Sequence, residues 1–345
     1  MNHPQSPWPG RYPRPLVPGG VLAVDAGNSK TDVALVAADG RVLGAARGGG
    51  FQPPVVGVEA AVSSLALIVA RAAADAGFPT GGGTPPVPLA EHTSACLANA
   101  DLPVEERRLA TAVHARGWAR STEVRNDTFA ILRAGVDEPR GVAVVCGAGI
   151  NCVGMLPDGR TARFPAIGRI SGDWGGGSGL AEEALFHAAR AEDGRGGPTA
   201  LATTLPAHFG LTSMYALIEA LHLETIPAAR RYELTPVLFA TSDAGDPVAR
   251  SILDRQAEEI VALATVALGR LGLLDEEADV VLGGGVMAAR NRYLMDAITD
   301  RLTARAPKAR PHVVTAPPVL GAALLGLDHV AAPPQARSAL RAHYA

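Results

Sequence analysis

Two short glycine-rich turns, each directly after a run of apolar residues, hold the side chains with the clearest potential for chemistry. The first is DAGNSKT at Asp25–Thr31, and the second is CGAGIN at Cys146–Asn151. A turn without bulky side chains lets backbone N–H groups approach phosphate oxygens, and a carboxylate such as Asp25 at its mouth can hold the magnesium ion that accompanies a nucleotide. Two such turns indicate two halves of the molecule arranged around one nucleotide.

A further candidate is Asp127, which stands between a predicted strand, Thr122–Arg125, and a predicted helix, Thr128–Val136. An aspartate at such a boundary is a common N-cap, because its side chain accepts hydrogen bonds from the first backbone N–H groups of the helix. The same position can also present a carboxylate that accepts a proton from a bound hydroxyl group. The local sequence leaves both interpretations open.

Length and charge limit the class of protein. A chain of 345 residues exceeds what one core usually fills, so we expect two domains. The net charge is −3 without a cluster of lysine and arginine, which argues against nucleic acid or an anionic membrane as a partner and favours a small charged ligand. Residues 1–20 are rich in proline and glycine and lack an apolar segment, so we expect a disordered tail on a cytoplasmic protein.

The three cysteines, Cys96, Cys146 and Cys152, have no CxxC spacing and lie in apolar or glycine-rich surroundings. We expect reduced, buried thiols rather than a metal or redox site.

The elements that must position these residues follow an order that begins twice. In the first half, apolar runs and turn residues predict the order β-β-β-α-β-α-β-α. Its strands are expected at Val21–Val24, Asp32–Ala37, Arg41–Ala46, Leu89–Leu97 and Thr122–Arg125, and its helices at Val58–Ala76, Val104–Ala119 and Thr128–Val136. The same start recurs at Val142–Val145, Ile150–Leu156 and Arg160–Phe164, which indicates a duplicated fold.

The second half then departs by a mainly helical insertion at about 179–274. Its helices are expected at Leu180–Ala191, Leu211–Leu221 and Asp246–Leu271, and the later elements at Asp279–Leu282 (strand), Gly283–Gly285 (turn), Asn291–Ala304 (helix), His312–Thr315 (strand) and Leu320–His329 (last helix). We therefore expect an N-terminal lobe of residues 21–137 and a C-terminal lobe of residues 138–317. A C-terminal helix within 318–331 should pack back on the first lobe.

Five motifs together resemble the BadF/BadG/BcrA/BcrD-type ATPase family, which includes N-acetylglucosamine kinase and belongs to the sugar kinase and actin superfamily. They are DAGNSKTD at Asp25–Asp32, ND at Asn126–Asp127, CGAGINC at Cys146–Cys152, GDWGGGSG at Gly172–Gly179 and VVLGGGV at Val280–Val286. One glycine turn would be weak evidence, but five motifs in the family's order are specific. The resemblance implies an α/β fold with two ribonuclease H-like (actin-like ATPase) domains around a nucleotide cleft, and the use of ATP and Mg²⁺.

The resemblance also implies the nucleotide contacts. Asp25 would orient hydrated Mg²⁺, and the adenosine would lie against Gly283, Gly284 and Gly285. The residues expected to line the ATP phosphates are Gly27, Asn28, Ser29, Lys30, Thr31, Gly147, Ala148 and Gly149. Backbone donors, a hydroxyl and a cation suit that task. Ala148 departs from the family, which carries Ser or Thr there, so one phosphate-contacting hydroxyl is missing.

By the same resemblance, the acceptor is the O6 hydroxyl of an amino sugar such as N-acetylglucosamine or glucosamine, with Asp127 as the catalytic base. The residues expected to contact the sugar are Asn126, Asp127, Asn151, Asp173 and Gln52. Gln52 stands in for an asparagine that the resembling kinases carry near the loop, and Trp174 replaces their glutamate, so the identity of the sugar stays open. Asp173 can alternatively be a structural turn residue among glycines.

Two other classes of function remain open. Relatives in the broad family are ATPases that activate reductases and hold an iron–sulfur cluster between two subunits, but the cysteines here are not spaced for a cluster. A nucleotide-binding regulator without turnover would fit Ala148 and the altered sugar loop, whereas a base at Asp127 argues for turnover. The resemblance and the long helix Asp246–Leu271 make a homodimer reasonable.

Overall fold

The structure is a computed structural model that describes residues 15–79 and 87–345. Within these residues the chain forms two compact units. Unit 1 runs to Pro139 and resumes at Thr315, and unit 2 comprises Arg140–Val314. The chain therefore leaves unit 1, builds unit 2 and returns to complete unit 1.

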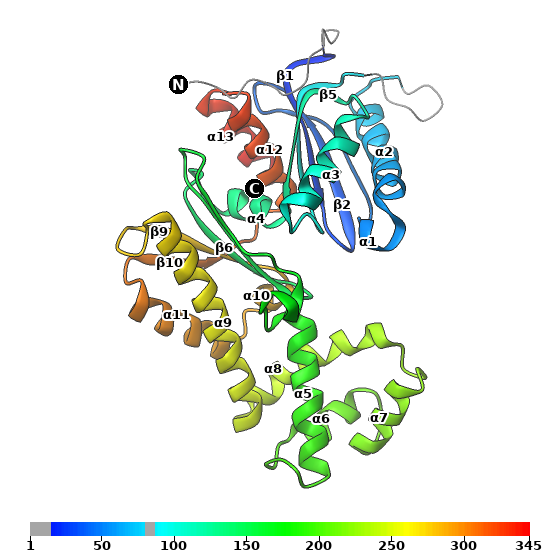
Figure 1. Cartoon of the computed structure of the whole chain (residues 1–345), viewed down its shortest axis with the longest axis vertical. Helices are drawn as coiled ribbons and strands as arrows, with labels where there is room; N and C mark the ends of the chain where they lie inside the picture. Colours follow the sequence, from blue (N-terminus) through cyan, green and yellow to red (C-terminus); the bar gives the residue numbers. More distant parts are fainter. Residues whose placement is uncertain (1–14, 80–86) are drawn as a thin grey trace. The chain divides into compact units, whose positions relative to one another are not determined.

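Unit 1 is built on a five-stranded sheet in the order β3-β2-β1-β4-β5 (Figure 1). Its strands are β1 (Val17–Ala26), β2 (Lys30–Val36), β3 (Val42–Gly49), β4 (Ala90–Leu97) and β5 (Ala119–Asn126). The first three strands are antiparallel, and β4 and β5 run parallel to β1. The seven residues Gly20–Ala26 of β1 are all buried, which is typical of a central strand covered on both faces.

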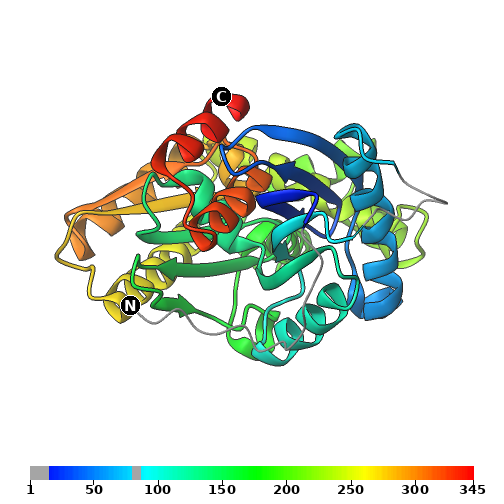
Figure 2. The ribbon, with the colours of Figure 1, turned by 90° about the horizontal axis from the view of Figure 1, so that it is seen from above.

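Helices cover both faces of this sheet. They are α1 (Pro53–Val56), α2 (Val58–Asp75), α3 (Pro103–His114), α4 (Thr128–Gly135), α12 (Pro318–His329) and α13 (Pro334–Tyr344). Figures 1 and 2 both show α2 and α12 on opposite faces. Two glycines let α12 pack closely: a Cβ on Gly321 would lie 1.8 Å from the carbonyl oxygen of Ala130 in α4, and one on Gly326 would lie 2.3 Å from Val21 in β1.

Unit 2 repeats the sheet order of unit 1. Its strands are β6 (Gly141–Cys146), β7 (Ile150–Met155), β8 (Thr161–Arg163), β9 (Ala278–Gly283) and β10 (Ala309–Val313), arranged β10-β9-β6-β7-β8. Strands β6 to β8 are antiparallel, and β9 and β10 run parallel to β6. The antiparallel start followed by two parallel strands is therefore present twice, which confirms the duplicated fold that the sequence indicates.

Unit 2 carries most of the helices in the described chain. They are the 3₁₀ helices η1 (Gly168–Ser171) and η2 (Ala228–Glu233) and the α-helices α5 (Gly176–Glu192), α6 (Leu201–His208), α7 (Met214–His222), α8 (Leu234–Asp243), α9 (Pro247–Leu271), α10 (Gly285–Ala288) and α11 (Arg292–Arg305). The elements η1 to α9 lie between β8 and β9 in the chain. Asp246 caps α9 by accepting a hydrogen bond from the backbone N–H of Ala249, at 2.8 Å.

Several predicted boundaries are wrong. Of the expected tail 1–20, residues 1–14 lie outside the described residues. Residues 17–20 are not a tail, because they form the start of β1. The helix expected to reach Ala119 ends at His114, because Gly117 with φ of +65° breaks it and Ala119 begins β5. The strand predicted at His312–Thr315 begins earlier, at Ala309, because residues Ala309–Val313 pair in parallel with Ala278–Leu282 of β9.

The sequence patterns also missed five α-helices and both 3₁₀ helices. The missed α-helices are α1, α6, α8, α10 and α13. Both α6 and α8 contain a proline, Pro206 and Pro236 respectively, and a proline in a sequence normally predicts the end of a helix. In α8 the proline lies in the first turn, where a helix tolerates it. The C-terminal helix predicted within 318–331 ends at His329, and α13 follows it. Among the described residues, no helix is both long enough and apolar enough to cross a membrane.

Candidate active site

The carboxyl ends of three neighbouring strands gather the candidate catalytic residues of unit 1. Asp25 in β1 lies opposite Cys96 in β4, which in turn lies opposite Arg125 in β5. The backbone N–H of Asp127, just beyond β5, donates to the carbonyl oxygen of Leu97 at 3.2 Å. Because β1, β4 and β5 are parallel, Asp25 and Asp127 both lie at the carboxyl ends of their strands, on the same side of the sheet's strand ends.

Asp25 is a buried carboxyl group with too much negative charge around it. Its side chain is 6% exposed, and its pKa is raised to about 8. The largest cause is burial, followed by the negative charges of Asp127 and Asp32, while Lys30 and Arg47 act in the opposite direction. Asp32 is directly opposite Asp25 in β2 and is held by Arg47 through contacts of 2.6 and 3.1 Å. A cation at Asp25 would relieve this excess of negative charge.

Asp127 does not cap the helix that follows it. Its side chain makes no capping hydrogen bond, and the backbone N–H of Thr128 donates to Asn126 Oδ1 at 3.0 Å. The N-cap interpretation of Asp127 is therefore wrong, and Asn126 takes that role. Asn126 Nδ2 also donates to Asp101 Oδ1 at 2.8 Å, so this predicted sugar contact is engaged in the fold.

Burial raises the pKa of Asp127 to about 6, although the nearby backbone N–H groups of Thr128 and Asp127 itself act to lower it. A carboxyl group with this pKa is ionised at neutral pH and is still a better proton acceptor than an exposed aspartate. A buried carboxyl group with such a pKa is a candidate for proton transfer.

The first glycine turn joins β1 to β2 and leaves its side chains available. The backbone N–H of Gly27 donates to the carbonyl oxygen of Lys30 at 2.9 Å. The side chains of Asn28, Ser29 and Lys30 are exposed, whereas Thr31 is buried in β2. The predicted phosphate-contacting segment is thus a tight turn that presents polar groups outward.

Two amides brace this turn. Gln52 Nε2 donates to the carbonyl oxygen of Asn28 at 2.9 Å, and Asn99 Nδ2 donates to Asn28 Oδ1 at 3.0 Å and to the carbonyl oxygen of Phe51 at 3.2 Å. Asn99 was missed by the sequence analysis. Its φ of +62° just after β4 is a conformation that asparagine tolerates better than most residues, and an asparagine directly after a predicted strand is the pattern that indicates it.

A cavity of about 660 Å³ lies beside the first turn in unit 1. Most of its wall comes from α2 and from the end of β3, including Gly48, Gly49 and Ile68, and Thr31, Phe51 and Arg71 also line it. This wall is largely apolar. Phe51, next to the predicted sugar contact Gln52, is buried and 2% exposed.

The second glycine turn, at residues 147–149, is joined to the start of α5. Gly177 and Ser178 donate their backbone N–H groups to the carbonyl oxygens of Gly147 and Ala148, at 2.8 and 2.9 Å. Gly176 has φ of +73°, and a Cβ there would lie 2.4 Å from the backbone of Gly149. The turn therefore lies at the N-terminus of a 17-residue helix, which favours an anion.

A buried glutamine supports this junction. Gln256, in α9, is fully buried, and its Oε1 accepts the backbone N–H of Gly176 at 2.9 Å. Its role was not predicted, because a glutamine within a long helical pattern gives no sign that it bonds a glycine loop elsewhere in the chain.

The third glycine turn packs on the second. Gly283 ends β9, Gly285 begins α10, and Gly284 between them has φ of +87°. A Cβ on Gly284 would lie 2.3 Å from the carbonyl oxygen of Cys146. The glycine segments 147–149, 175–177 and 283–285 therefore gather at one place in unit 2, which spacing along the sequence does not reveal.

A pocket of about 240 Å³ in unit 2 brings Asp173 and Trp174 close to the second turn. Its other lining residues are Ala148, Gly149, Ile150, Ala166, Gly168, Arg169, Gly175, Ser178, Gly179 and Glu182. Asp173 Oδ2 accepts the backbone N–H of Gly168 at 3.0 Å and the hydroxyl of Ser171. The carboxylate of Asp173 thus closes a local turn and also lines a pocket.

Trp174 and Asn151 are held by neighbours. Trp174 is buried, its Nε1 donates to Glu183 Oε1 at 3.3 Å, and the guanidinium of Arg255 lies 4.1 Å from its ring centroid. Asn151, at the start of β7, accepts the backbone N–H of Cys152 at 2.7 Å through Oδ1. Asn151 is not among the residues that line the pocket of Asp173.

All three cysteines are buried and none forms a disulfide, as expected. Burial raises the pKa of the Cys146 thiol to about 12 and that of Cys152 further. Thiols held in this protonated state are poor metal ligands and nucleophiles.

Comparison with known proteins agrees with the motifs. The model of the BadF/BadG/BcrA/BcrD ATPase family matches residues 22–326. The N-acetyl-D-glucosamine kinase of Dictyostelium discoideum is 28% identical over 207 residues, which are 59% of this chain and 65% of the relative. The N-acetylmuramic acid/N-acetylglucosamine kinase of Clostridium acetobutylicum is 27% identical over 224 residues, 64% of this chain and 73% of the relative.

A solved structure also has the same fold. It is described as an N-acetylglucosamine kinase of Chromobacterium violaceum, has 22% sequence identity and a TM-score of 0.67, and matches over 89% of this chain and 98% of its own. The expected α/β fold with two ribonuclease H-like domains is confirmed. Because the family model spans most of the chain, this protein belongs to the BadF/BadG/BcrA/BcrD ATPase family.

Proposed function

We propose that this chain is an ATP-dependent kinase that phosphorylates a hydroxyl group, O6, of an amino sugar of the N-acetylglucosamine class. Kinases of N-acetylglucosamine and N-acetylmuramic acid among its relatives support the reaction. The observation that carries the proposal is the pair of carboxyl groups at one sheet edge. Asp25 is buried near two other negative charges, and Asp127 has a raised pKa and makes no capping hydrogen bond through its side chain.

The residues of unit 1 fit a magnesium ion at Asp25. Asp25 is buried beside the carboxylates of Asp127 and Asp32, which raise its pKa more than Lys30 and Arg47 lower it, and oxygen ligands are those that Mg²⁺ prefers. When bound, Mg²⁺ neutralises charge on the phosphates of ATP. In this proposal Asp25 holds the hydrated ion, and the exposed polar groups of residues 27–31 hold the phosphates.

Asp127 would act as the general base. Its carboxylate accepts the proton of the attacking hydroxyl, so that the sugar oxygen can form a bond to the γ-phosphorus as the bond to the leaving ADP oxygen breaks. Asn99 and Gln52 position the phosphate turn through Asn28 rather than taking part in proton transfer.

Unit 2 would bind phosphate through backbone donors. The turn 147–149 lies at the positive end of α5, so anion binding there does not require the hydroxyl that Ala148 lacks. Gly283–Gly285 would lie against the adenosine, and Asp173 and Asn151 would contact sugar hydroxyls. Support for Asp173 is its place in the wall of a 240 Å³ pocket beside the second turn.

A second function, ATP hydrolysis or regulation without sugar turnover, is favoured by two observations. Ala148 removes a hydroxyl from the phosphate turn, and the carboxylate of Asp173 is already bonded to Gly168 and Ser171.

ADP release distinguishes the two functions. Protein with Mg·ATP would be assayed with N-acetylglucosamine, glucosamine, N-acetylmannosamine, N-acetylmuramic acid, glucose or no sugar. A kinase releases ADP only with its acceptor, and mass spectrometry then finds the sugar phosphate. Equal release with every sugar and without sugar would overturn the proposal in favour of an ATPase.

A further inference from the structure

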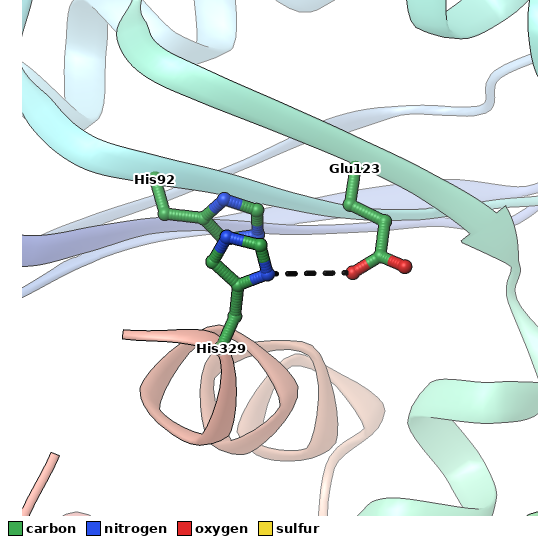
Figure 3. Close-up of side chains that lie close together, drawn as sticks. All are labelled: His92, Glu123 and His329. Carbon is green, nitrogen blue, oxygen red and sulfur yellow. Dashed lines mark ion pairs between the residues drawn. The ribbon is translucent and has the colours of Figure 1, made fainter. Parts of the chain in front are cut away.

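Two histidines and a glutamate meet in unit 1 on residues that the proposed kinase reaction does not use. They are His92 in β4, Glu123 in β5 and His329 at the last position of α12 (Figure 3). One nitrogen or oxygen atom from each lies within 4.8 Å of the others. In the part of the chain that the structure describes, this is the only group of three histidine, cysteine, aspartate or glutamate side chains whose ligand atoms lie within 4.8 Å of one another.

The buried histidine has a ring nitrogen without a hydrogen-bond partner. His92 is 1% exposed, and its Nδ1 lies 2.9 Å from Ser121 Oγ. Ser121 Oγ also lies 3.3 Å from the carbonyl oxygen of Glu91, and when the hydroxyl donates to that oxygen it accepts the Nδ1–H of His92. In that tautomer Nε2 is an acceptor, and it has no hydrogen-bond partner although it is buried.

An unpartnered buried acceptor is unusual, because burial without a partner costs free energy. A metal ion satisfies such a nitrogen, and a histidine that binds a metal normally donates its other N–H to a neighbour, as His92 does to Ser121. The environment of His92 is therefore that of a metal ligand with its outer hydrogen bond already in place.

The other two side chains can reach a shared ion. His329 and Glu123 are 47% and 40% exposed, and His329 Nδ1 lies 4.0 Å from Glu123 Oε2. Arg125 is the opposing charge nearby, but it pairs with Glu123 Oε1 at 2.7 Å and leaves Oε2 on the side of His329. The C-terminal end of α12, where His329 lies, is also favourable for a cation.

We propose that His92, Glu123 and His329 form a binding site for a divalent transition-metal ion of the Zn²⁺ type. Two imidazole nitrogens and one carboxylate oxygen are ligands that zinc accepts, with water in the fourth position. Bound there, the ion would join the C-terminal helix α12 to strands β4 and β5.

Binding requires one local movement. The rings of His92 and His329 are stacked, with centroids 3.8 Å apart and planes 12° from parallel, so their lone pairs do not converge on one point. His329 is at the end of its helix and about half exposed, so its ring can turn out of the stack while His92 stays fixed. Metal binding should therefore separate the two rings.

Cobalt titration tests the site in the full-length protein. Chelator-treated protein without ATP or sugar would be titrated with Co²⁺ in excess Mg²⁺, and the visible absorption of four-coordinate Co²⁺ would be followed. We expect one equivalent to bind and Zn²⁺ to displace it. His329→Ala and Glu123→Gln should each weaken binding by about tenfold or more. His329→Ala is preferred over His92→Ala because it does not open the core.

His222→Ala is the matched control, since His222 is an exposed last residue of another helix, α7. This variant should bind Co²⁺ like the wild type. Zn²⁺ should raise the thermal midpoint of the wild type and of His222→Ala but not that of His329→Ala. Equal Co²⁺ affinity in the wild type and His329→Ala, or no stoichiometric binding by the wild type, would show that the cluster is only a packed histidine pair.

Discussion

At the scale of single residues, the candidate site depends on how burial changes two carboxyl groups. Asp25 and Asp127 both have raised pKa values, and in both cases desolvation is the largest cause. An aspartate with a raised pKa at the edge of a sheet, next to a glycine turn, is a common feature of functional sites. The chemistry proposed here therefore depends on the depth of these groups as well as on their identity.

The pKa of Asp127 gives the expected pH dependence. A general base must be ionised, and the carboxyl group is protonated as the pH falls through about 6. We expect kcat/KM for the sugar to be level near neutral pH and to fall about tenfold per unit below pH about 6. Initial rates between about pH 5 and pH 8, with circular dichroism to check folding, measure this. A rate that stays level down to about pH 5 would exclude Asp127 as the base.

Ala148 offers a gain-of-function test at the same scale. Replacing it with threonine adds a hydroxyl to an exposed turn. The resembling family carries Ser or Thr at this position. We expect KM for ATP to decrease about 3–10-fold through one added hydrogen bond to a charged phosphate. Ala148→Val adds similar bulk without a hydroxyl and should not lower KM. If both variants behave alike, Ala148 does not face a phosphate.

At the scale of elements, the glycine turns are held together by close backbone contacts. Gly176 and Gly284 both have positive φ, and a side chain on either would collide with the backbone of the second turn. These contacts fix the turns 147–149 and 283–285 as one group within unit 2.

Gly284→Ala should disrupt this group. The added Cβ would meet the carbonyl oxygen of Cys146 at 2.3 Å in a left-handed conformation, so we expect a loss of about 2–4 kcal/mol in the free energy of unfolding, together with weaker ATP binding. Gly285→Ala is the control for stability alone, because a Cβ there meets nothing within 4 Å. Thermal denaturation and nucleotide titration measure both effects. Equal stability of the two variants would contradict the packing described.

The sequence predicted most strands and the longer helices, because apolar periodicity and glycine turns determine them locally. It also predicted that Asp25 stands at the end of a strand and that Asp127 stands between a strand and a helix. It did not predict that Asn126 rather than Asp127 caps α4, or that Asn99 and Gln256 brace the turns. Those roles depend on which segments pack together, and residues distant in the sequence decide that.

At the scale of the whole molecule, unit 1 is discontinuous and depends on the end of the chain. Helix α12 packs against β1 and α4, and nine of its residues are buried. Arg133 of α4 is 1% exposed and pairs with Asp328 of α12 at 2.7 Å. Loss of Asp328 would leave the buried guanidinium of Arg133 without its ion-pair partner, which is costly.

Truncation after Val314 tests this dependence. Removal of α12 and α13 would expose one face of the unit 1 sheet, so we expect unit 1 to lose its protection from hydrogen exchange while unit 2 retains it. Exchange measured by mass spectrometry reports on each unit separately. Unchanged protection of β1 and β4 in the truncated chain would show that the C-terminal helices are dispensable.

The most direct test of the central claim compares sugar-dependent ADP release by the wild type, Asp127→Asn and Asp137→Asn. Asp137 is a fully exposed aspartate beyond the other end of α4 and controls for the same chemical change. We expect Asp127→Asn to lower kcat by about 10²–10⁴-fold with ATP affinity nearly unchanged, and Asp137→Asn to have little effect. Near wild-type turnover by Asp127→Asn, or ADP release that needs no sugar, would contradict the proposed kinase reaction.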